Sequence, residues 1–152
     1  MELPQDFNDL LKFFAERKVE YLLVGGYAFA IHAYPRTTGD IDLFIRIAPE
    51  NAEKILAALN DFGFGAVNLK AQDFLTPGMV IQLGVEPFRV DLLTSIEGVT
   101  WEEADRNKII VVSDSGVSLP VIGKNELIRN KLSTGREKDL LDVKKIRELE
   151  EK

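Results

Sequence analysis

The sequence predicts an α/β (α+β) fold in which a mixed β-sheet of about four to five strands carries helices mainly on one face, followed by a C-terminal helical pair. Short apolar runs of strand length, such as Tyr21–Val24 and Ile41–Ile47, alternate with segments of helical periodicity. Glycines and prolines separate these segments. The 152 residues are 45% hydrophobic and 29% charged, which is typical of a globular chain with a substantial core.

Composition limits the domain organisation and the compartment. We expect one domain over residues 1–152, with its core in 1–123 and two helices in 124–152. The absence of cysteine excludes disulfides and thiolate metal sites and is typical of a reducing cytoplasm. The first residues lack the features of a signal peptide, and the longest apolar stretch is well short of the roughly 20 residues that span a bilayer. A cytoplasmic protein without membrane contact is therefore predicted.

The net charge of −6 is distributed unevenly, because the acidic excess lies in residues 1–123 and residues 124–152 have a small positive balance. An acidic total argues against a general nucleic-acid coat, which needs a basic footprint. Two interpretations of the C-terminal segment stay open. It could dock an RNA end, or it could be a solvated helical face of mixed charge.

The predicted elements follow the hydrophobic pattern in chain order. Asp6 is the expected N-cap of the first helix, and Pro49 is expected in the first turn of the third. Residues 64–70 and 108–112 could each be a strand or an extended segment. Helices are expected at residues 5–17, 27–34, 49–61, 100–107, 124–133 and 136–150, and strands at 21–24, 41–47, 79–83 and 88–93.

Two carboxylates stand at the start of the second predicted strand. Side chains alternate between the faces of a strand, so Asp40 and Asp42 share one face while the apolar stripe from Ile41 to Ile47 faces the core. Carboxylates this close repel each other unless a cation lies between them. Mg²⁺ commonly takes one or two carboxylates together with substrate phosphates. The alternative is a solvated strand end with two acids of no function.

A third acid, Asp91, lies within the apolar run Phe88–Leu93. An unpaired carboxylate is costly inside a core strand. The cost is avoided if this strand lies beside residues 41–47, so that Asp91 joins Asp40 and Asp42. Three carboxylates on adjacent strands can hold two metal ions roughly 3.5–4 Å apart, which is a catalytic arrangement for displacement at phosphorus.

These segments resemble a known family. Gly25-Gly26, then Arg36-Thr-Thr-Gly-Asp40-Ile-Asp42-Leu, then Val90-Asp91-Leu92 are similar in order and spacing to the nucleotidyltransferase superfamily, which has the DNA polymerase β-like fold. The Gly-Gly turn and residues 126–139 resemble small prokaryotic nucleotidyltransferases of the abortive-infection toxin type. The resemblance covers Tyr21 to about Asp142. One departure is Gly26, since many superfamily members have a serine there whose hydroxyl helps to hold the phosphates.

The resemblance implies roles for individual residues. Asp40, Asp42 and Asp91 are the expected catalytic residues and the ligands of Mg²⁺, or of Mn²⁺ in its place. The expected nucleotide-binding residues are Gly25, Gly26, Arg36, Thr38 and Lys131. Each has a plainer alternative: a bare turn for the glycines, an ion pair for the cations and loop capping for Thr38. His32, the only histidine, is expected to pack or cap rather than act as a base.

The predicted function is Mg²⁺-dependent transfer of a nucleoside monophosphate from a nucleoside triphosphate, such as ATP, to a hydroxyl acceptor. The acceptor stays open between RNA, including tRNA, and a small alcohol. The resemblance also implies a toxin that pairs with an antitoxin protein. The rival hypothesis is a catalytically degenerate domain of the same fold that binds nucleotides or another protein.

Overall fold

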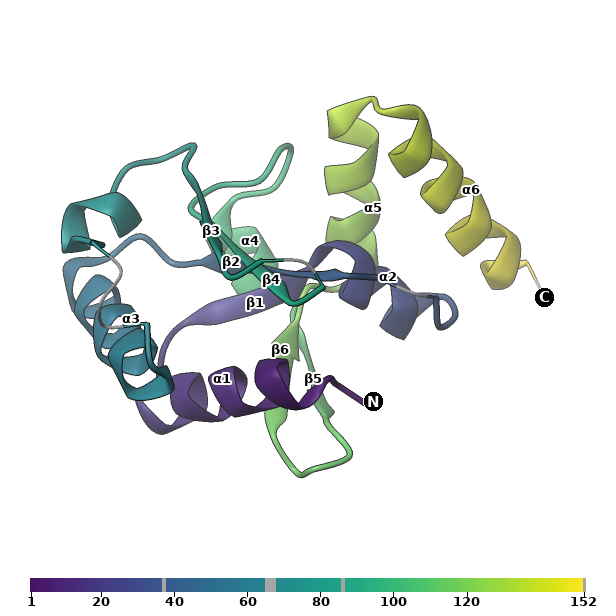
Figure 1. Ribbon diagram of the computed structural model, residues 1–152. Coiled ribbons are helices and arrows are strands. Elements are labelled where there is room, and N and C mark those ends of the chain that lie inside the picture. Colours follow the sequence, from purple (N-terminus) through teal and green to yellow (C-terminus); the bar gives the residue numbers. More distant parts are fainter. Residues whose placement is uncertain (37, 65–67, 86, 152) are drawn as a thin grey trace.

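The computed structural model describes residues 1–36, 38–64, 68–85 and 87–151. In that part of the chain, one six-stranded mixed sheet has the strand order β3-β4-β2-β1-β6-β5 (Figure 1). The central pair β1–β2 is antiparallel, whereas β2–β4 and β1–β6 are parallel. The strands are β1 (Tyr21–Val24), β2 (Asp40–Ile45), β3 (Val80–Leu83), β4 (Arg89–Leu93), β5 (Ile109–Val112) and β6 (Ser118–Val121).

The prediction of about four to five strands was too low, because β6 was not expected. This strand contains Pro120, which has no N–H to donate and argues against a strand inside a sheet. The sheet accommodates it because β6 has only one paired position with β1, between Leu23 and Val121. On its other side β6 forms a regular antiparallel ladder with β5. Residues 108–112 thus contain a strand, β5, which the sequence had left open.

Six α-helices and one 3₁₀ helix surround this sheet in the described residues. They are α1 (Gln5–Glu16), α2 (Gly25–His32), α3 (Pro49–Phe62), η1 (Ala71–Phe74), α4 (Trp101–Arg106), α5 (Lys124–Thr134) and α6 (Glu137–Glu150). The expected N-cap was wrong, since α1 begins at Gln5 with Pro4 at the N-cap position, and Asp6 lies in its first turn. Within the segment 64–70, residues 65–67 lie outside the described part, and residues 68–70 form neither strand nor helix.

Helices lie on both faces of the sheet, which corrects the expectation of one covered face. On the face that carries Tyr21 and the fully buried Ile45, Phe14 of α1 packs edge-on against Tyr21 at 5.6 Å between ring centroids. On the opposite face, Trp101 of α4 packs against Phe44 at 5.3 Å. Figure 1 shows α1 and α3 together on one side, with α4 on the other side of the strands. Trp101 is therefore a packing residue.

The last two helices, α5 and α6, lie on the side of the molecule where α2 lies, and α5 contacts α2 (Figure 1). α5 ends at Gly135, whose φ of 67° is the left-handed conformation that favours glycine at a helix C-terminus. The helical break predicted at Thr134-Gly135 is confirmed. No helix in the described part of the chain is long and apolar enough to cross a membrane.

Candidate active site

The turn between β1 and α2 is built against the second acid. Gly25 opens α2 with a φ of 67°, and a Cβ at this position would overlap Oδ2 of Asp42. Val24, the last residue of β1, is the register partner of Asp42 across the antiparallel pair. The conformation and the close approach therefore both require glycine at position 25. This arrangement places the first residue of α2 beside the carboxylate of Asp42.

The three acids meet where β2 and β4 begin. In the parallel ladder, Asp40 pairs with Arg89 and Asp42 pairs with Asp91, so all four side chains extend from the same face of the sheet. The sequence prediction that residues 88–93 lie beside 41–47 is thus confirmed. Asp91 is buried, whereas Asp40 and Asp42 are half-buried.

Arg89 is the cation that the sequence analysis did not place in this group. Its Nη2 donates to Oδ2 of Asp40 at 2.5 Å and to Oδ2 of Asp91 at 3.3 Å. Its Nε donates to Oδ1 of Asp91 at 3.1 Å. The guanidinium therefore bridges the first and third acids. A signal was present in the sequence, because Arg89 and Asp91 are two residues apart and so share a strand face.

Asp42 has a perturbed acidity. Its burial, together with the charges of Asp91 and Asp40, raises the pKa to about 6, although the charge of Arg89 acts in the opposite direction. A carboxyl with this pKa exchanges its proton near neutral pH. Carboxyls with perturbed pKa values are concentrated at functional sites, because burial and neighbouring like charges at such sites adjust the pKa of the catalytic groups.

The chemistry of the acids fits a divalent metal, but their present arrangement is that of an ion pair. Three carboxylates on adjoining strands supply hard oxygen donors. Oδ1 of Asp40 is buried without a hydrogen-bond partner among the described residues, which is an available acceptor. However, no group of three or more His, Cys, Asp or Glu side chains in the described ranges is arranged to hold a metal ion. The bridging guanidinium of Arg89 gives a physical reason for this, since it takes up oxygens that a metal would use.

Two neighbouring cavities meet at this group. The first, of about 480 Å³, is lined by Asp40, Asp42 and Asp91. The second, of about 450 Å³, extends from Asp42 toward β3 and is lined there by Met79 and other apolar side chains. Volumes of this size are typical of small-ligand sites. Both cavities also share Gly25, Lys131, Arg136 and Asp139.

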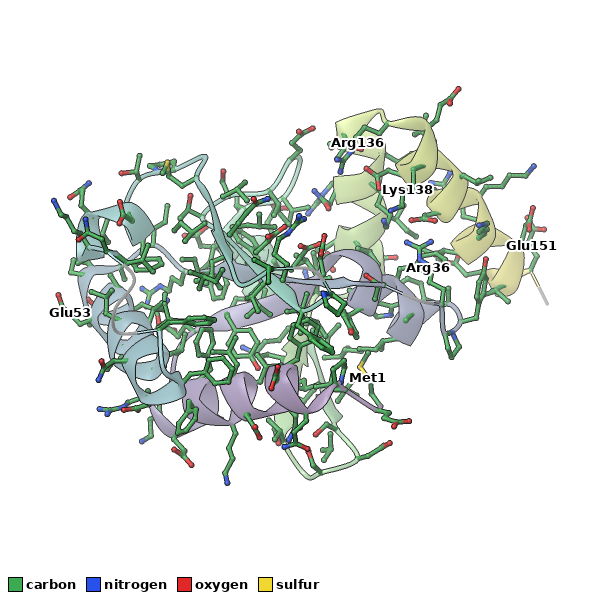
Figure 2. The ribbon with its side chains drawn as sticks, viewed as in Figure 1. Met1, Arg36, Glu53, Arg136, Lys138 and Glu151 are labelled. Atoms are coloured by element: carbon green, nitrogen blue, oxygen red, sulfur yellow. The ribbon has the colours of Figure 1, made fainter. Side chains whose placement is uncertain are left out.

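Four cationic side chains line the first cavity: Arg36, Lys131, Arg136 and Lys138. Figure 2 shows Arg36, Arg136 and Lys138 on the side of the molecule where α5 and α6 lie. Arg136 is 73% exposed although its Nε donates to Asp139 at 2.8 Å. A mobile phosphate-bearing ligand in this cavity would therefore meet positive charge from α6 opposite the acids of the sheet.

A model of the family "Nucleotidyltransferase of unknown function (DUF6036)" matches residues 1–149. The chain belongs to this family. It is also similar to the crystal structure of "a putative nucleotidyltransferase" from Thermotoga maritima, with 17% sequence identity and a TM-score of 0.60, over 96% of this chain and 91% of that chain. At this identity the likeness shows the fold alone. No curated protein matches the sequence. The superfamily expected from the sequence is supported, and neither description names a toxin or an acceptor.

Two predicted nucleotide-binding residues of this nucleotidyltransferase-family chain are held in ion pairs. Nζ of Lys131 donates to Asp142 at 2.9 Å and to Asp139 at 3.3 Å, and its side chain is only 7% exposed. Arg36 forms a two-pronged pair with Asp142, at 2.7 and 3.0 Å, and lies over the ring of Phe29. Both side chains border the cavity, so the structure places them beside the acids but already engaged.

Burial alone would raise the pKa of the two carboxyls that pair with these cations, Asp139 and Asp142. Hydrogen bonds from Arg36 and Lys131 nevertheless hold the pKa of Asp142 below its ordinary value. At Asp139, the hydrogen bond from Thr134 and the charge of Lys131 also overcome burial and lower the pKa. Asp139 and Asp142 are therefore anionic partners. Their pairing depends on the turn at Gly135, which sequence spacing alone does not define.

Gly26 and Thr38 face each other at the rim of the first cavity. A Cβ on Gly26 would lie 2.8 Å from Oγ1 of Thr38 and 3.2 Å from its Cβ, which is too close for ordinary contact. The Thr38 hydroxyl donates to the carbonyl of Asp40 at 3.2 Å. The hydroxyl of Thr38 therefore occupies the space that a side chain at position 26 would take, where many superfamily members have a serine.

The histidine has a structural contact. Nε2 of His32 lies 2.7 Å from the carbonyl oxygen of Ile122, and because a carbonyl can only accept, the nitrogen donates. This bond ties the end of α2 to the segment after β6. The predicted packing or capping role of His32 is consistent with this placement away from the three acids.

Proposed function

We propose that this protein transfers a nucleoside monophosphate from a nucleoside triphosphate to a hydroxyl acceptor. In the reaction, the acceptor oxygen bonds to the α-phosphorus and the bond from that phosphorus to the bridging oxygen of the β-phosphate breaks. Pyrophosphate leaves with the bonding electron pair, and the acceptor hydroxyl gives up its proton. Family membership supports the reaction class.

The acids are assigned to the reacting end of the triphosphate. Asp40, Asp42 and Asp91 would hold Mg²⁺, or Mn²⁺, through carboxylate oxygens that include the unpartnered Oδ1 of Asp40. The metal, when bound, supplies charge neutralisation of the phosphates and lowers the pKa of the acceptor hydroxyl. Asp91 lies beside Asp42 in the β2–β4 register and would accept the proton of that hydroxyl.

The phosphates are assigned to the opposite wall of the same cavity. The helix α2 begins at Gly25, which lies beside Asp42, and the free N–H groups of a helix start suit an anion. The exposed Arg136 and the neighbouring Lys138 add positive charge from α6. Arg36 and Lys131 contribute through their field while they stay paired with Asp142. Alignment and charge neutralisation are the principal sources of rate enhancement in such a site.

One observation supports the proposal most strongly. Gly25, Asp42 and Asp91 are brought together by two independent registers, β1 with β2 and β2 with β4. A structural role alone does not explain a glycine whose missing Cβ makes room for a carboxylate beside two further carboxylates. The glycine turn that opens α2 and the acid cluster thus line the same cavity.

The acceptor is proposed by chemical class only, as RNA, including tRNA, or a small alcohol. A toxin paired with an antitoxin is one biological setting for an RNA acceptor.

A second candidate function is favoured by a specific observation. Because Arg89 already neutralises Asp40 and Asp91, the fold could serve as a nucleotide-binding or protein-interaction domain without catalysis.

Labelled-nucleotide transfer separates these proposals. Each of the four triphosphates, labelled at the α-phosphate, is incubated with Mg²⁺ and either total RNA or a panel of small alcohols. The reaction should label one acceptor class, and Asp42→Asn should abolish transfer while the fold persists. Asp61→Asn is the matched control, because that carboxylate lies in α3 at the surface and forms an ion pair with Arg17. Full transfer by Asp42→Asn would overturn the catalytic assignment.

A further inference from the structure

The bridging arginine of the acid group occupies a position that matters for cation binding. Arg89 is the register neighbour of Asp40 and lies two residues before Asp91 on the same strand face. Its guanidinium contacts three oxygens of these two carboxylates at 2.5 to 3.3 Å. These oxygens belong to two of the three acids that line the first cavity. The positive charge of Arg89 therefore lies between Asp40 and Asp91 and offsets the repulsion between these two carboxylates.

A divalent cation and this guanidinium cannot share these oxygens. The guanidinium donates its N–H groups in fixed directions and has no acceptor, so it competes with a metal for the same lone pairs. At a separation of a few Å the two cations also repel each other, and this repulsion is poorly screened in a partly buried site. The absence of a metal-ready acid group in the described residues agrees with this competition.

We propose that Arg89 is a built-in counter-cation of the Asp40–Asp91 pair, which stabilises the metal-free site and has to turn away before a divalent metal can use these carboxylates. The side chain has room to do so, because it is 29% exposed and Arg89 is the first residue of β4. Arg89 is thus a positioning residue that sets the affinity of the site for metal.

The inference rests on the proposed function in one respect, which is the destination of the displaced guanidinium. A triphosphate in the first cavity offers phosphate oxygens, which match the guanidinium fork. Metal bound together with the triphosphate would therefore displace Arg89 more readily than metal alone. The consequence is a site that stays closed to free metal ions and opens to the metal–nucleotide complex.

The experiment measures binding of Mn²⁺ alone, by electron paramagnetic resonance of the free ion, to the intact metal-free protein. Arg89→Gln removes the charge, Arg89→Lys keeps it, and Arg46→Gln is the matched control because Arg46 forms an ion pair with Glu20 beyond the other end of β2. We expect Arg89→Gln to bind Mn²⁺ roughly tenfold tighter than the wild type or more, since a competing positive charge is gone. Arg89→Lys and Arg46→Gln should stay near the wild type.

Thermal unfolding provides a second readout. Without metal, Arg89→Gln should melt below the wild type because three carboxylates repel, and saturating Mn²⁺ should raise its melting temperature more than that of the wild type. Unchanged or weaker Mn²⁺ binding by folded Arg89→Gln would overturn the proposal. If Mn²⁺ binding tightens but no triphosphate binds, the inference on Arg89 stands and the proposed function fails. If Mg²⁺–triphosphate binds and Arg89→Gln does not tighten Mn²⁺ binding, the reverse holds.

Discussion

Arg36 and Asp142 form a two-pronged ion pair across 106 residues of sequence, with Nη1–Oδ1 at 2.7 Å and Nη2–Oδ2 at 3.0 Å. The pair joins the loop before β2 to α6 and so attaches the C-terminal helices to the rim of the acid cavity. Lys131 of α5 shares the same carboxylate. Because Asp142 is almost fully buried, the loss of a partner leaves a charge that water cannot easily solvate.

Arg36→Ala should lower the free energy of unfolding by about 2 kcal/mol, the scale of hydrogen bonds to a charged group. Urea denaturation at neutral pH measures the change. Arg46→Ala is the matched control, because its pair with Glu20 is half-exposed on both sides and should contribute much less to stability. Equal effects of the two substitutions would contradict the structural role of the Arg36–Asp142 pair.

Asp42 should make the metal-free protein less stable as the pH rises. Its burial and the neighbouring acids raise the pKa from 3.8 to about 6, so in that window the folded chain holds a proton that the unfolded chain has lost. The stabilising effect of this proton is complete below about pH 4 and is lost through pH 6. With a chelator at pH 7.5, Asp42→Asn should therefore unfold at higher denaturant, by of the order of 2 kcal/mol.

The pH dependence of that difference is the decisive feature. The gap between Asp42→Asn and the wild type should shrink as the pH falls from 7 toward 4 in a series of urea titrations. Asp142→Asn should show the opposite trend, since Arg36 and Lys131 hold that pKa low and the stability it provides is lost as the pH falls below about 4. A gap for Asp42→Asn that is constant across pH would show that its pKa is not raised.

Gly25→Ala should damage the site beyond its cost in stability. The substitution forces alanine into a φ of 67° and pushes its Cβ onto Asp42. Gly135→Ala is a matched control with the same φ of 67° and nothing within 4 Å of the added Cβ. Both should lose about 1–2 kcal/mol of stability through left-handed strain, but only Gly25→Ala should also weaken Mg²⁺–nucleotide binding, measured by calorimetry.

Gly26→Ser tests whether the Thr38 hydroxyl occupies the place of a side chain at position 26. The added Cβ would approach Oγ1 of Thr38 at 2.8 Å, so we expect a loss of about 1–3 kcal/mol, the usual cost of overpacking. In a double-mutant cycle with Thr38→Ala, the second change should relieve part of the first. Strict additivity of the two substitutions would mean that the side chains do not compete for this space.

Local pattern was sufficient for the part of the site that strands define. Alternation along 40–47 and 88–93 placed the acids on one face, and Ile41, Leu43 and Ile45 are buried as predicted. Ile47, the last residue of the predicted stripe, lies beyond the end of β2 and is exposed. The pairing of these two strands could be predicted because a lone carboxylate such as Asp91 is costly to bury in a sheet unless polar or charged partners lie beside it. The Gly25 turn was also recognisable, because its glycines precede a helix directly.

The remaining features depend on geometry that sequence spacing does not contain. The ion pairs of Arg89 depend on the direction that its side chain takes on the sheet face. The sequence shows only that Arg89 and Asp91 lie on the same face of their strand. The pairing of Lys131 with Asp142 depends on how the turn at Gly135 orients α6 against α5. The strand β6 was missed because Pro120 argues against a strand in the local sequence. Residues 118–121 form a strand because they pair with β5, and this pairing cannot be read from the local sequence.

The most direct test of the central claim is thermal unfolding of the wild type and of Asp42→Asn with ATP, GTP, CTP and UTP, each with and without Mg²⁺. A ligand that binds only the folded state raises the melting temperature by mass action. We predict a Mg²⁺-dependent increase with at least one triphosphate, absent in Asp42→Asn when each protein is compared with its own ligand-free state. No shift with any triphosphate in the wild type would contradict the assignment of a metal–nucleotide site to Asp40, Asp42 and Asp91.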